Sequence, residues 1–290
     1  EDTNICLGNS MTINAGNGFS GYLWNTTSDS PSISVISGGT YIVTVTNADG
    51  CTDADTIYVT QNPPVSALFS STDVSCYGLS DGSATVSASG GTIPFSFLWS
   101  NGQTAPTSTS LGNGVYTATV TDSKGCSVSL SVFIDEPAQL VMNSIITEPV
   151  CTDVNDGKIV LTVYGGTIPY SFNWNDGNIS EDNDSLPSGN YSVTITDNNN
   201  CAINQSFIIN SPLSIFIDAD VTDASCTGGN NGSIEIQVFG GTSPYSYHWN
   251  TGVGTQNIMS LPSGIYSVTV TDMNGCTEKL SMEVGDLKIK

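Results

Sequence analysis

Residues 111–126 read LGNGVYTATVTDSKGC, and this stretch decides the fold. From Tyr116 to Val120 apolar side chains alternate with threonine, and a period of two predicts a half-buried β-strand. Ser123-Lys124-Gly125 predicts the turn that ends this strand. The leucine and glycines ahead of Tyr116 are typical of a tyrosine corner, in which the phenol bonds back to the backbone beside a strand of an immunoglobulin-like sandwich.

The same pattern recurs along the 290 residues with a step of 75. The step is kept by the tryptophans Trp24, Trp99, Trp174 and Trp249, and by the tyrosines Tyr41, Tyr116, Tyr191 and Tyr266. A fixed period of this kind predicts a chain of similar domains. We therefore predict four modules, at residues 1–61, 62–136, 137–211 and 212–286, followed by a short tail at 287–290.

The sequence of the second module predicts six or seven short strands. They lie at residues 65–71, 83–89, 95–99 and 115–122, with an edge segment that ends at residue 111 and a last strand that begins at residue 126. Turn signals separate these segments, and none has the pattern of an amphipathic helix. The chain is therefore predicted to be all-β, with four tandem immunoglobulin-like β-sandwich modules in an extended rod. We expect the repeated tryptophans and tyrosines to belong to the module cores.

Charge limits the partners of this chain. It has 27 acidic residues against five lysines, no arginine and a formal net charge of −22. Nucleic-acid binding needs a basic surface, so we expect no nucleic-acid partner. No run approaches the ~20 apolar residues of a membrane span, so we expect no membrane insertion. The sequence begins at Glu1 without a signal peptide, and it is interpreted as a mature extracellular protein or as a piece excised from a longer one.

Two cysteines in each module predict disulfide bonds, because a domain of ~75 residues buries too little surface to be stable without help. A zinc site is not expected, because the chain has one histidine and no Cys-x-x-Cys. Pairing within modules is favoured because it uses every cysteine. Its pairs are Cys6–Cys51, Cys76–Cys126, Cys151–Cys201 and Cys226–Cys276.

A second pairing scheme follows from immunoglobulin strand order, which places the two cysteines of one module at opposite ends. A disulfide needs Cα atoms within ~7 Å. In this scheme Cys76 pairs with Cys201 of the next module, and Cys51 and Cys226 require flanking modules. The linkers are short and contain proline, which stiffens a joint. The linkers at residues 62–64 and 210–212 lack the carboxylates of a cadherin-type calcium joint, so we do not expect that mechanism.

Catalytic and metal sites find little support in the sequence. The only histidine, His248, is predicted to face outward, so no nucleophilic triad is supported and we expect no enzyme. Asp81-Gly82, Asp156-Gly157 and Asn231-Gly232 are typical turn formers. If an ion binds, calcium is the expected cofactor, at the densest acidic group, which consists of Asp153, Asp156, Glu181, Asp182 and Asp184.

The segments CYGLSDGSA (76–84), GGTIPFSFLWSNG (90–102) and LGNGVYTATVTDSKGC (111–126) together resemble the SprB-type repeat of large surface adhesins in gliding and other Bacteroidota. Modules 3 and 4 fit this repeat closely, with Asn200 before Cys201 and Asn231 in place of aspartate. The first module departs from it and is more similar to general Ig-like or PKD-like modules. The resemblance implies export to the cell surface by the type IX system within a long chain of such units. It also implies possible O-glycosylation sites at Thr56 and Ser185.

Two functions are open at this point. The first is a structural stalk segment of a cell-surface adhesin, used in adhesion or gliding motility, whose partners are flanking repeats and, through other regions, an external surface or polysaccharide. The second is direct binding of a glycan or surface by the segments that vary most between modules. These variable segments follow each tryptophan, at residues 103–110, 178–185 and 252–260.

Overall fold

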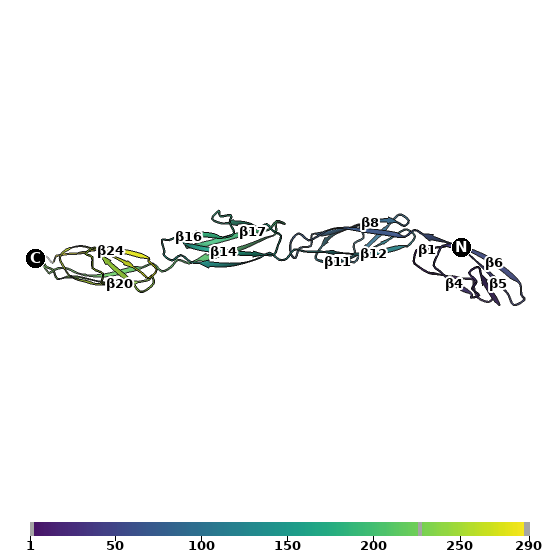
Figure 1. The fold of residues 1–290 in the computed structure, drawn as a ribbon, viewed down its shortest axis with the longest axis horizontal. Helices are drawn as coiled ribbons and strands as arrows, with labels where there is room; N and C mark the ends of the chain where they lie inside the picture. The colour runs from purple at the N-terminus through teal and green to yellow at the C-terminus, as the bar shows by residue number, and fades with distance from the viewer. Residues whose placement is uncertain (1–2, 226–227, 287–290) are drawn as a thin grey trace. The chain divides into compact units, whose positions relative to one another are not determined.

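The structure, a computed structural model, describes residues 3–225 and 228–286. Within these residues it contains β-strands and no α-helix, which confirms the all-β prediction. No helix there is long and apolar enough to cross a membrane. The chain divides into two compact units, Glu1–Gln139 and Leu140–Lys290. Each unit holds two modules, which are coloured in chain order in Figure 1.

The first unit contains modules 1 and 2. The strands of module 1 are β1 (Thr3–Cys6), β2 (Met11–Asn14), β3 (Gly21–Trp24), β4 (Ser32–Val35), β5 (Gly39–Thr46) and β6 (Thr52–Asn62). The strands of module 2 are β7 (Val65–Thr72), β8 (Gly82–Gly90), β9 (Ser96–Trp99), β10 (Thr107–Leu111), β11 (Gly114–Thr121) and β12 (Ser127–Ile134).

The second unit contains modules 3 and 4. The strands of module 3 are β13 (Val141–Thr147), β14 (Gly157–Tyr164), β15 (Ser171–Trp174), β16 (Asn183–Leu186), β17 (Gly189–Thr196) and β18 (Ala202–Ile209). The strands of module 4 are β19 (Phe216–Thr222), β20 (Gly232–Phe239), β21 (Ser246–Trp249), β22 (Ile258–Leu261), β23 (Gly264–Thr271) and β24 (Thr277–Val284).

Modules 2 to 4 share one immunoglobulin-like sandwich topology. In module 2 one sheet has the order β10-β8-β7 and the other the order β12-β11-β9, and modules 3 and 4 repeat both orders. The predicted alternating strand is β11, which pairs antiparallel with β12 from Gly114 opposite Ile134 to Thr121 opposite Ser127. Its inward valine and alanine side chains face the second sheet, and its threonines lie on the outer face.

Module 1 departs from this plan in the way its first strand pairs. There β1 runs parallel to β6 in a four-stranded sheet of order β1-β6-β5-β3, and β2 pairs only with β4. In modules 2 to 4 the first strand instead pairs antiparallel with the second strand. The sequence signals this departure, because module 1 lacks the Gly-Gly-Thr-x-Pro turn of the other three.

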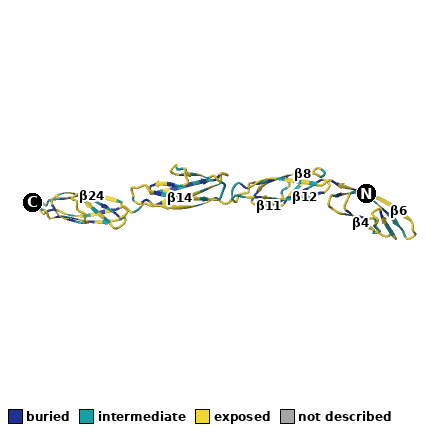
Figure 2. Ribbon diagram, in the orientation of Figure 1, coloured by how far each residue is buried: buried dark blue, intermediate teal, exposed yellow. Residues whose placement is uncertain are grey.

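Each module has its own hydrophobic core between its two sheets. Figure 2 marks buried positions along the strands. The four tryptophans lie at the centres of these cores and are at most 2% exposed. Apolar burial of this kind is the main stabilising contribution in a small sandwich. Strand alternation therefore directs one face of every strand inward and leaves both ends of each module to the connecting loops.

Candidate functional site at the module junctions

In modules 1 and 2 the first cysteine lies beside the end of that module's last strand. In module 1 the parallel pairing of β1 with β6 places Cys6 opposite Asn62. In module 2 the amide of Val74 donates to the carbonyl oxygen of Asp135, at 2.9 Å, just beyond β12. Ala224 forms an equivalent parallel bridge in module 4. These contacts carry the first-cysteine loop to the end at which the chain leaves the module.

The Asx-Gly pairs that the sequence identifies as turn formers hold this loop. In modules 2 to 4 the Asx Oδ1 accepts an amide six residues earlier: Asp81 from Ser75 at 3.0 Å, Asp156 from Val150 at 3.0 Å and Asn231 from Ser225 at 2.9 Å. The Ser75 hydroxyl and amide hold the pKa of the Asp81 carboxyl below its ordinary value. In modules 2 and 3 the donating residue immediately precedes the first cysteine, so the Asx side chain fixes the backbone that presents the thiol.

The second cysteine lies at the opposite end of the module, after a turn held by a buried carboxylate. In module 2 the Oδ1 atom of Asp122 accepts the amides of Lys124 and Cys126, both at 2.9 Å. Its Oδ2 atom accepts the amide of Thr92, also at 2.9 Å. One side chain therefore ties the second-cysteine turn to the Gly-Gly-Thr turn that follows β8.

The same clamp recurs in the other modules. Asp197 and Asp272 each accept three amides in the same arrangement. In module 1 Asn47 replaces the aspartate, and its Oδ1 accepts the Cys51 amide at 2.9 Å. The turn also needs a left-handed residue before the cysteine. This residue is glycine in modules 1, 2 and 4, and Asn200 with φ +66° in module 3, because asparagine tolerates this conformation better than most residues.

Hydrogen bonding keeps two of these carboxylates ionised although they are buried. Asp122 is 5% exposed and Asp272 is 6% exposed. Burial alone would raise the pKa of each carboxyl, but the donated amides together hold the pKa below its ordinary value. Lys124 adds a favourable charge interaction at Asp122. The clamp is therefore strongest at neutral pH.

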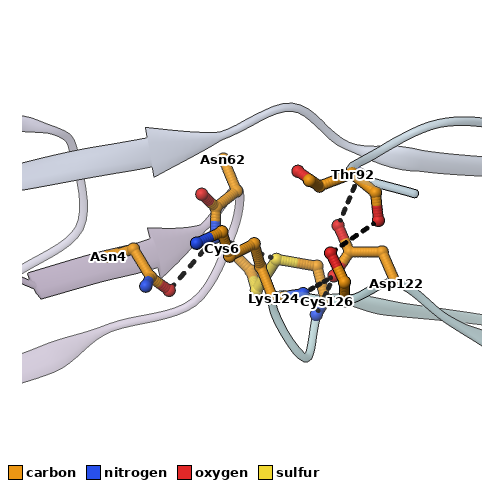
Figure 3. The surroundings of a disulfide bond; sticks show 8 residues. Asn4, Cys6, Asn62, Thr92, Asp122, Lys124 and Cys126 are labelled. Carbon is orange, nitrogen blue, oxygen red and sulfur yellow. Dashed lines mark hydrogen bonds between the residues drawn. A yellow bond between two sulfur atoms is a disulfide. The ribbon is translucent and has the colours of Figure 1, made fainter. Parts of the chain in front are cut away.

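The end of module 1 that carries its first cysteine meets the end of module 2 that carries its second cysteine, as Figure 3 shows. Cys6 and Cys126 form a disulfide with their Cα atoms 5.5 Å apart. Asn62 is buried beside this bond and donates from Nδ2 to Oδ1 of Asn4 at 3.2 Å. The Nδ2 atom also lies 3.5 Å from the Cys126 sulfur. A first cysteine is thus joined to the second cysteine of the following module.

The junction of modules 3 and 4 has the same connectivity. Cys151 and Cys276 form a disulfide with their Cα atoms 5.5 Å apart. The Cys276 sulfur lies 3.4 Å from the carbonyl oxygen of Val150, the residue whose amide Asp156 holds. The two described disulfides close loops of 120 and 125 residues, each longer than a whole module.

The favoured pairing within modules is therefore wrong for Cys6, Cys126, Cys151 and Cys276. The physical reason is that the two cysteines of one module lie at opposite ends of the sandwich, as the second pairing scheme assumes. The prediction that every cysteine is bonded is also wrong, since Cys51 is an exposed free thiol. Cys76 and Cys201 are disulfide-bonded. Cys226 lies outside the described residues.

The tyrosine corner is present in all four modules. The phenol of each tyrosine donates to a carbonyl oxygen four residues earlier: Tyr41 to Ser37, Tyr116 to Gly112, Tyr191 to Pro187 and Tyr266 to Pro262. Burial raises the pKa of the Tyr191 phenol, and Asp176 adds to the shift. These bonds fix the loop that leads into β5, β11, β17 and β23.

Each tryptophan anchors the start of the segment that follows it. The indole Nε1–H donates to the carbonyl oxygen six residues later, at 2.8 to 2.9 Å, in all four modules. The polar side chains of the variable segments form internal bonds as well. Gln103 exchanges two hydrogen bonds with the backbone of Thr109. In module 4 the Asn257 side chain accepts the amide of Ile236 on β20, and Gln256 donates to the carbonyl oxygen of the same residue.

The acidic residues proposed for calcium have individual partners. Asp156 accepts the Val150 amide, and Asp182 accepts the Leu161 amide and lies 3.6 Å from the Lys158 ammonium group. Over residues 3–225 and 228–286, no three His, Cys, Asp or Glu side chains gather where they could hold a metal ion. Calcium binding by the group Asp153, Asp156, Glu181, Asp182 and Asp184 remains a prediction.

Three other predicted positions are solvent-exposed. His248 lies on β21 with its side chain outward, next to the buried Trp249. Thr56 on β6 is exposed, and its amide bonds the Asp55 carboxylate. Ser185 on β16 is exposed and has φ +58°. Exposure makes the two hydroxyls accessible, and their glycosylation remains a prediction.

Comparison with known proteins identifies the repeat. The family model described as "SprB repeat" matches residues 68–104, 143–179 and 219–254. Each match covers most of the first three strands of modules 2, 3 and 4, and the first module is unmatched. The resemblance drawn from the sequence is thereby confirmed, and the chain contains three SprB repeats. No curated protein matches the sequence.

The solved structures that align with this chain include the ectodomains of adhesion proteins. The eight N-terminal Ig domains of Down Syndrome Cell Adhesion Molecule isoform 1.30.30 align over 98% of this chain and 59% of that one, at 10% identity and a TM-score of 0.29. The human desmocollin-1 ectodomain aligns over 97% and 72%, at 10% identity and a TM-score of 0.30. The chain thus spans less than two thirds of the first structure. The fold assignment rests on the strand order, because these scores are low.

Proposed function

We propose that these SprB-type modules form a structural stalk segment of a large secreted cell-surface adhesin. In this proposal the four modules form an extended rod that holds a binding region away from the cell during adhesion or gliding motility. The type IX system would export the parent chain. The coarser description, a repeat region of a cell-surface adhesin type, is supported by the three SprB repeats and the tandem sandwich fold.

One observation carries the stalk proposal, which is that the disulfides join successive modules. Asp122 and Asp272 hold the turns that present Cys126 and Cys276, and Asp156 holds the backbone before Cys151. A disulfide inside one sandwich would stabilise that sandwich alone. A disulfide between neighbours also fixes their joint, and a fixed joint is what a spacer needs and an isolated binding module does not.

Flanking repeats are the partners that we propose for this segment. Cys51 is exposed and unbonded, and it holds the place in module 1 that Cys126 and Cys276 hold in their modules. Asn47 fixes its turn as the aspartates fix theirs. We expect the first cysteine of another module to pair with Cys51 by exchange with an oxidised dithiol carrier. The two thiols lose two protons and two electrons, and the carrier's disulfide becomes a dithiol.

Thiol-blocked native material tests this pairing. A peptide containing Cys51 should be linked to a cysteine outside these 290 residues. Recovery of Cys51 as the alkylated thiol would contradict the pairing.

The alternative, direct glycan or surface binding through the variable segments, predicts a different outcome in a competition experiment. The purified chain is added in excess to cells that carry the parent adhesin while they attach to a polysaccharide surface. A stalk segment should leave attachment unchanged, whereas a binding segment should inhibit it. Glycan-array binding by the chain would support the alternative in the same way.

Small-angle scattering tests the rod itself. Strands of about eight residues at ~3.3 Å each, with their end loops, give four modules a length on the order of 150 Å when they are placed end to end. A maximum dimension near this value supports the proposal. A compact particle with a maximum dimension of about half that value would overturn the stalk role.

A further inference from the structure

We infer that the two described disulfides make this chain nearly inextensible when it is pulled from its two ends. The inference deepens the proposed stalk function and depends on it only for its biological meaning. A stalk made of unlinked small sandwiches would lengthen several-fold as its modules unfolded. The positions of the disulfides remove almost all of that length from the pulled chain.

The shortest covalent route between Cys6 and Cys276 is short. It passes through the first disulfide to Cys126, along the backbone to Cys151, and through the second disulfide to Cys276. Only the 25 residue steps between Cys126 and Cys151 belong to the backbone of this route. Residues 7–125 and 152–275 are bypassed, and with them strands β2 to β11 and β14 to β23.

The contour length of this route sets an upper limit on extension. At ~3.5 Å for each residue, 25 steps span roughly 90 Å, and the two disulfides add 5.5 Å each between Cα atoms. The limit is therefore about 100 Å. Without the disulfides the 270 steps from Cys6 to Cys276 would extend to about 950 Å. The two disulfides therefore reduce the maximum extension between Cys6 and Cys276 by roughly nine tenths.

Most of the route is already extended in the folded protein. It contains β12, with eight residues, and β13, with seven residues. Each β-strand rises about 3.3 Å per residue, close to the maximum for the chain. Stretching these segments therefore releases little length, and tension passes along them without requiring the strands to separate.

The strands on the route are also held along their whole length. All eight residues of β12 pair with β11, and all seven residues of β13 pair with β14. The bypassed strands carry no tension themselves, so each sandwich supports its loaded strand as an unloaded scaffold. Force then acts on the covalent bonds of the route and on the two extended strands β12 and β13. The other strands of the folded cores carry no load.

Single-molecule force spectroscopy tests the inference on the whole 290-residue chain, with a handle at each end. The oxidised chain should release no more than about 100 Å in total between Cys6 and Cys276, at any force below covalent rupture. The same molecule in excess reductant should show unfolding steps of about 200 Å or more, because a 75-residue module then unfolds along its full contour.

Cysteine variants separate the effect of the Cys6–Cys126 disulfide from the effect of replacing a cysteine. The double variant Cys6→Ser with Cys126→Ser returns at least the 70 residue steps from Cys6 to Cys76 to the pulled chain, so its limit on extension should rise by roughly 250 Å or more without reductant. Cys51→Ser is the matched control, and it should behave like the oxidised parent chain because Cys51 forms no disulfide. Module-sized steps in the oxidised parent chain would overturn the inference.

The outcomes distinguish this inference from the proposed function. A compact particle in scattering, or competition by the purified chain in the attachment experiment, would overturn the stalk role and leave the limit on extension intact. Long steps from the oxidised chain would remove the limit and leave the stalk role intact.

Discussion

The carboxylate that follows the tyrosine strand is the side chain on which each second-cysteine turn depends. Asp197, buried and 4% exposed, accepts the amides of Thr167, Asn199 and Cys201. Three amides converge on one side chain in a place with little access for water. Removing the acceptor therefore leaves three partly buried amides without it, and this destabilises the loop that presents the cysteine.

Asp197→Ala should lower the free energy of unfolding of module 3 by about 1–3 kcal/mol, because it leaves these amides without an acceptor. Asp197→Asn should cost less, because its Oδ1 can still accept the amides of Asn199 and Cys201, as Asn47 does in module 1. Urea denaturation of both variants measures the difference. Equal losses for the two substitutions would contradict this account of the clamp.

Stability should fall in acid because of Asp122 and Asp272. Hydrogen bonds hold the pKa of each carboxyl below its ordinary value in the folded chain. Their contribution is therefore fully present above the unfolded pKa, near ~4, and is lost as the pH falls through the lower folded pKa. Denaturation midpoints measured from pH 7 down to pH 2.5 should fall steeply below about pH 4. Asp122→Asn with Asp272→Asn should flatten this decline, and an unchanged slope would refute the assignment.

At the scale of elements, the Gly-Gly-Thr turn connects each sandwich to the segment that leads into it. Gly90 has φ +69°, Gly91 has φ +52°, and the Gly91 amide donates to the carbonyl oxygen of Pro64 at the module junction. A Cβ atom on Gly90 would collide with that same carbonyl oxygen. The turn needs glycine both for its conformation and for its close approach to the junction backbone.

Gly90→Ala should therefore destabilise module 2 by about 3 kcal/mol or more, because it adds a backbone collision to the left-handed strain. Gly102→Ala is the matched control, with φ +87° and no atom within 4 Å of the added Cβ. It should cost only the strain, about 1–2 kcal/mol. Thermal melting in reductant separates the two effects, and similar losses in both variants would argue against the collision.

The sequence predicts the elements better than their connections. Strand alternation and the tyrosine corner locate β11 to within a residue of its observed bounds, because both signals are local. The role of Asp122 could not be predicted, because its partner Thr92 is 30 residues away. Asn62 gives no local signal either, since its burial comes from contact with a cysteine of the next module. The favoured disulfide pairing within modules is wrong because it rests on proximity in the sequence. The sandwich places the two cysteines of a module at its opposite ends, and their partners belong to other modules.

At the scale of the whole molecule, disulfides between neighbouring modules stabilise the chain as well as connecting it. Each described bond closes a loop of 120 or 125 residues, worth about 5 kcal/mol in the chain-entropy estimate. Cys6→Ser with Cys126→Ser should lower the melting temperature of both modules of the first unit. Calorimetry measures this shift, with Cys51→Ser as the unaffected control. A change confined to one module would contradict coupling through the junction.

Disulfide connectivity is the central claim, and peptide mapping under non-reducing conditions tests it most directly. The 290-residue chain, produced without flanking modules, is alkylated, digested without reduction and analysed by mass spectrometry. The account predicts linked peptides that contain Cys6 with Cys126 and Cys151 with Cys276, together with alkylated Cys51. Linked peptides that contain Cys6 with Cys51, or Cys76 with Cys126, would contradict it.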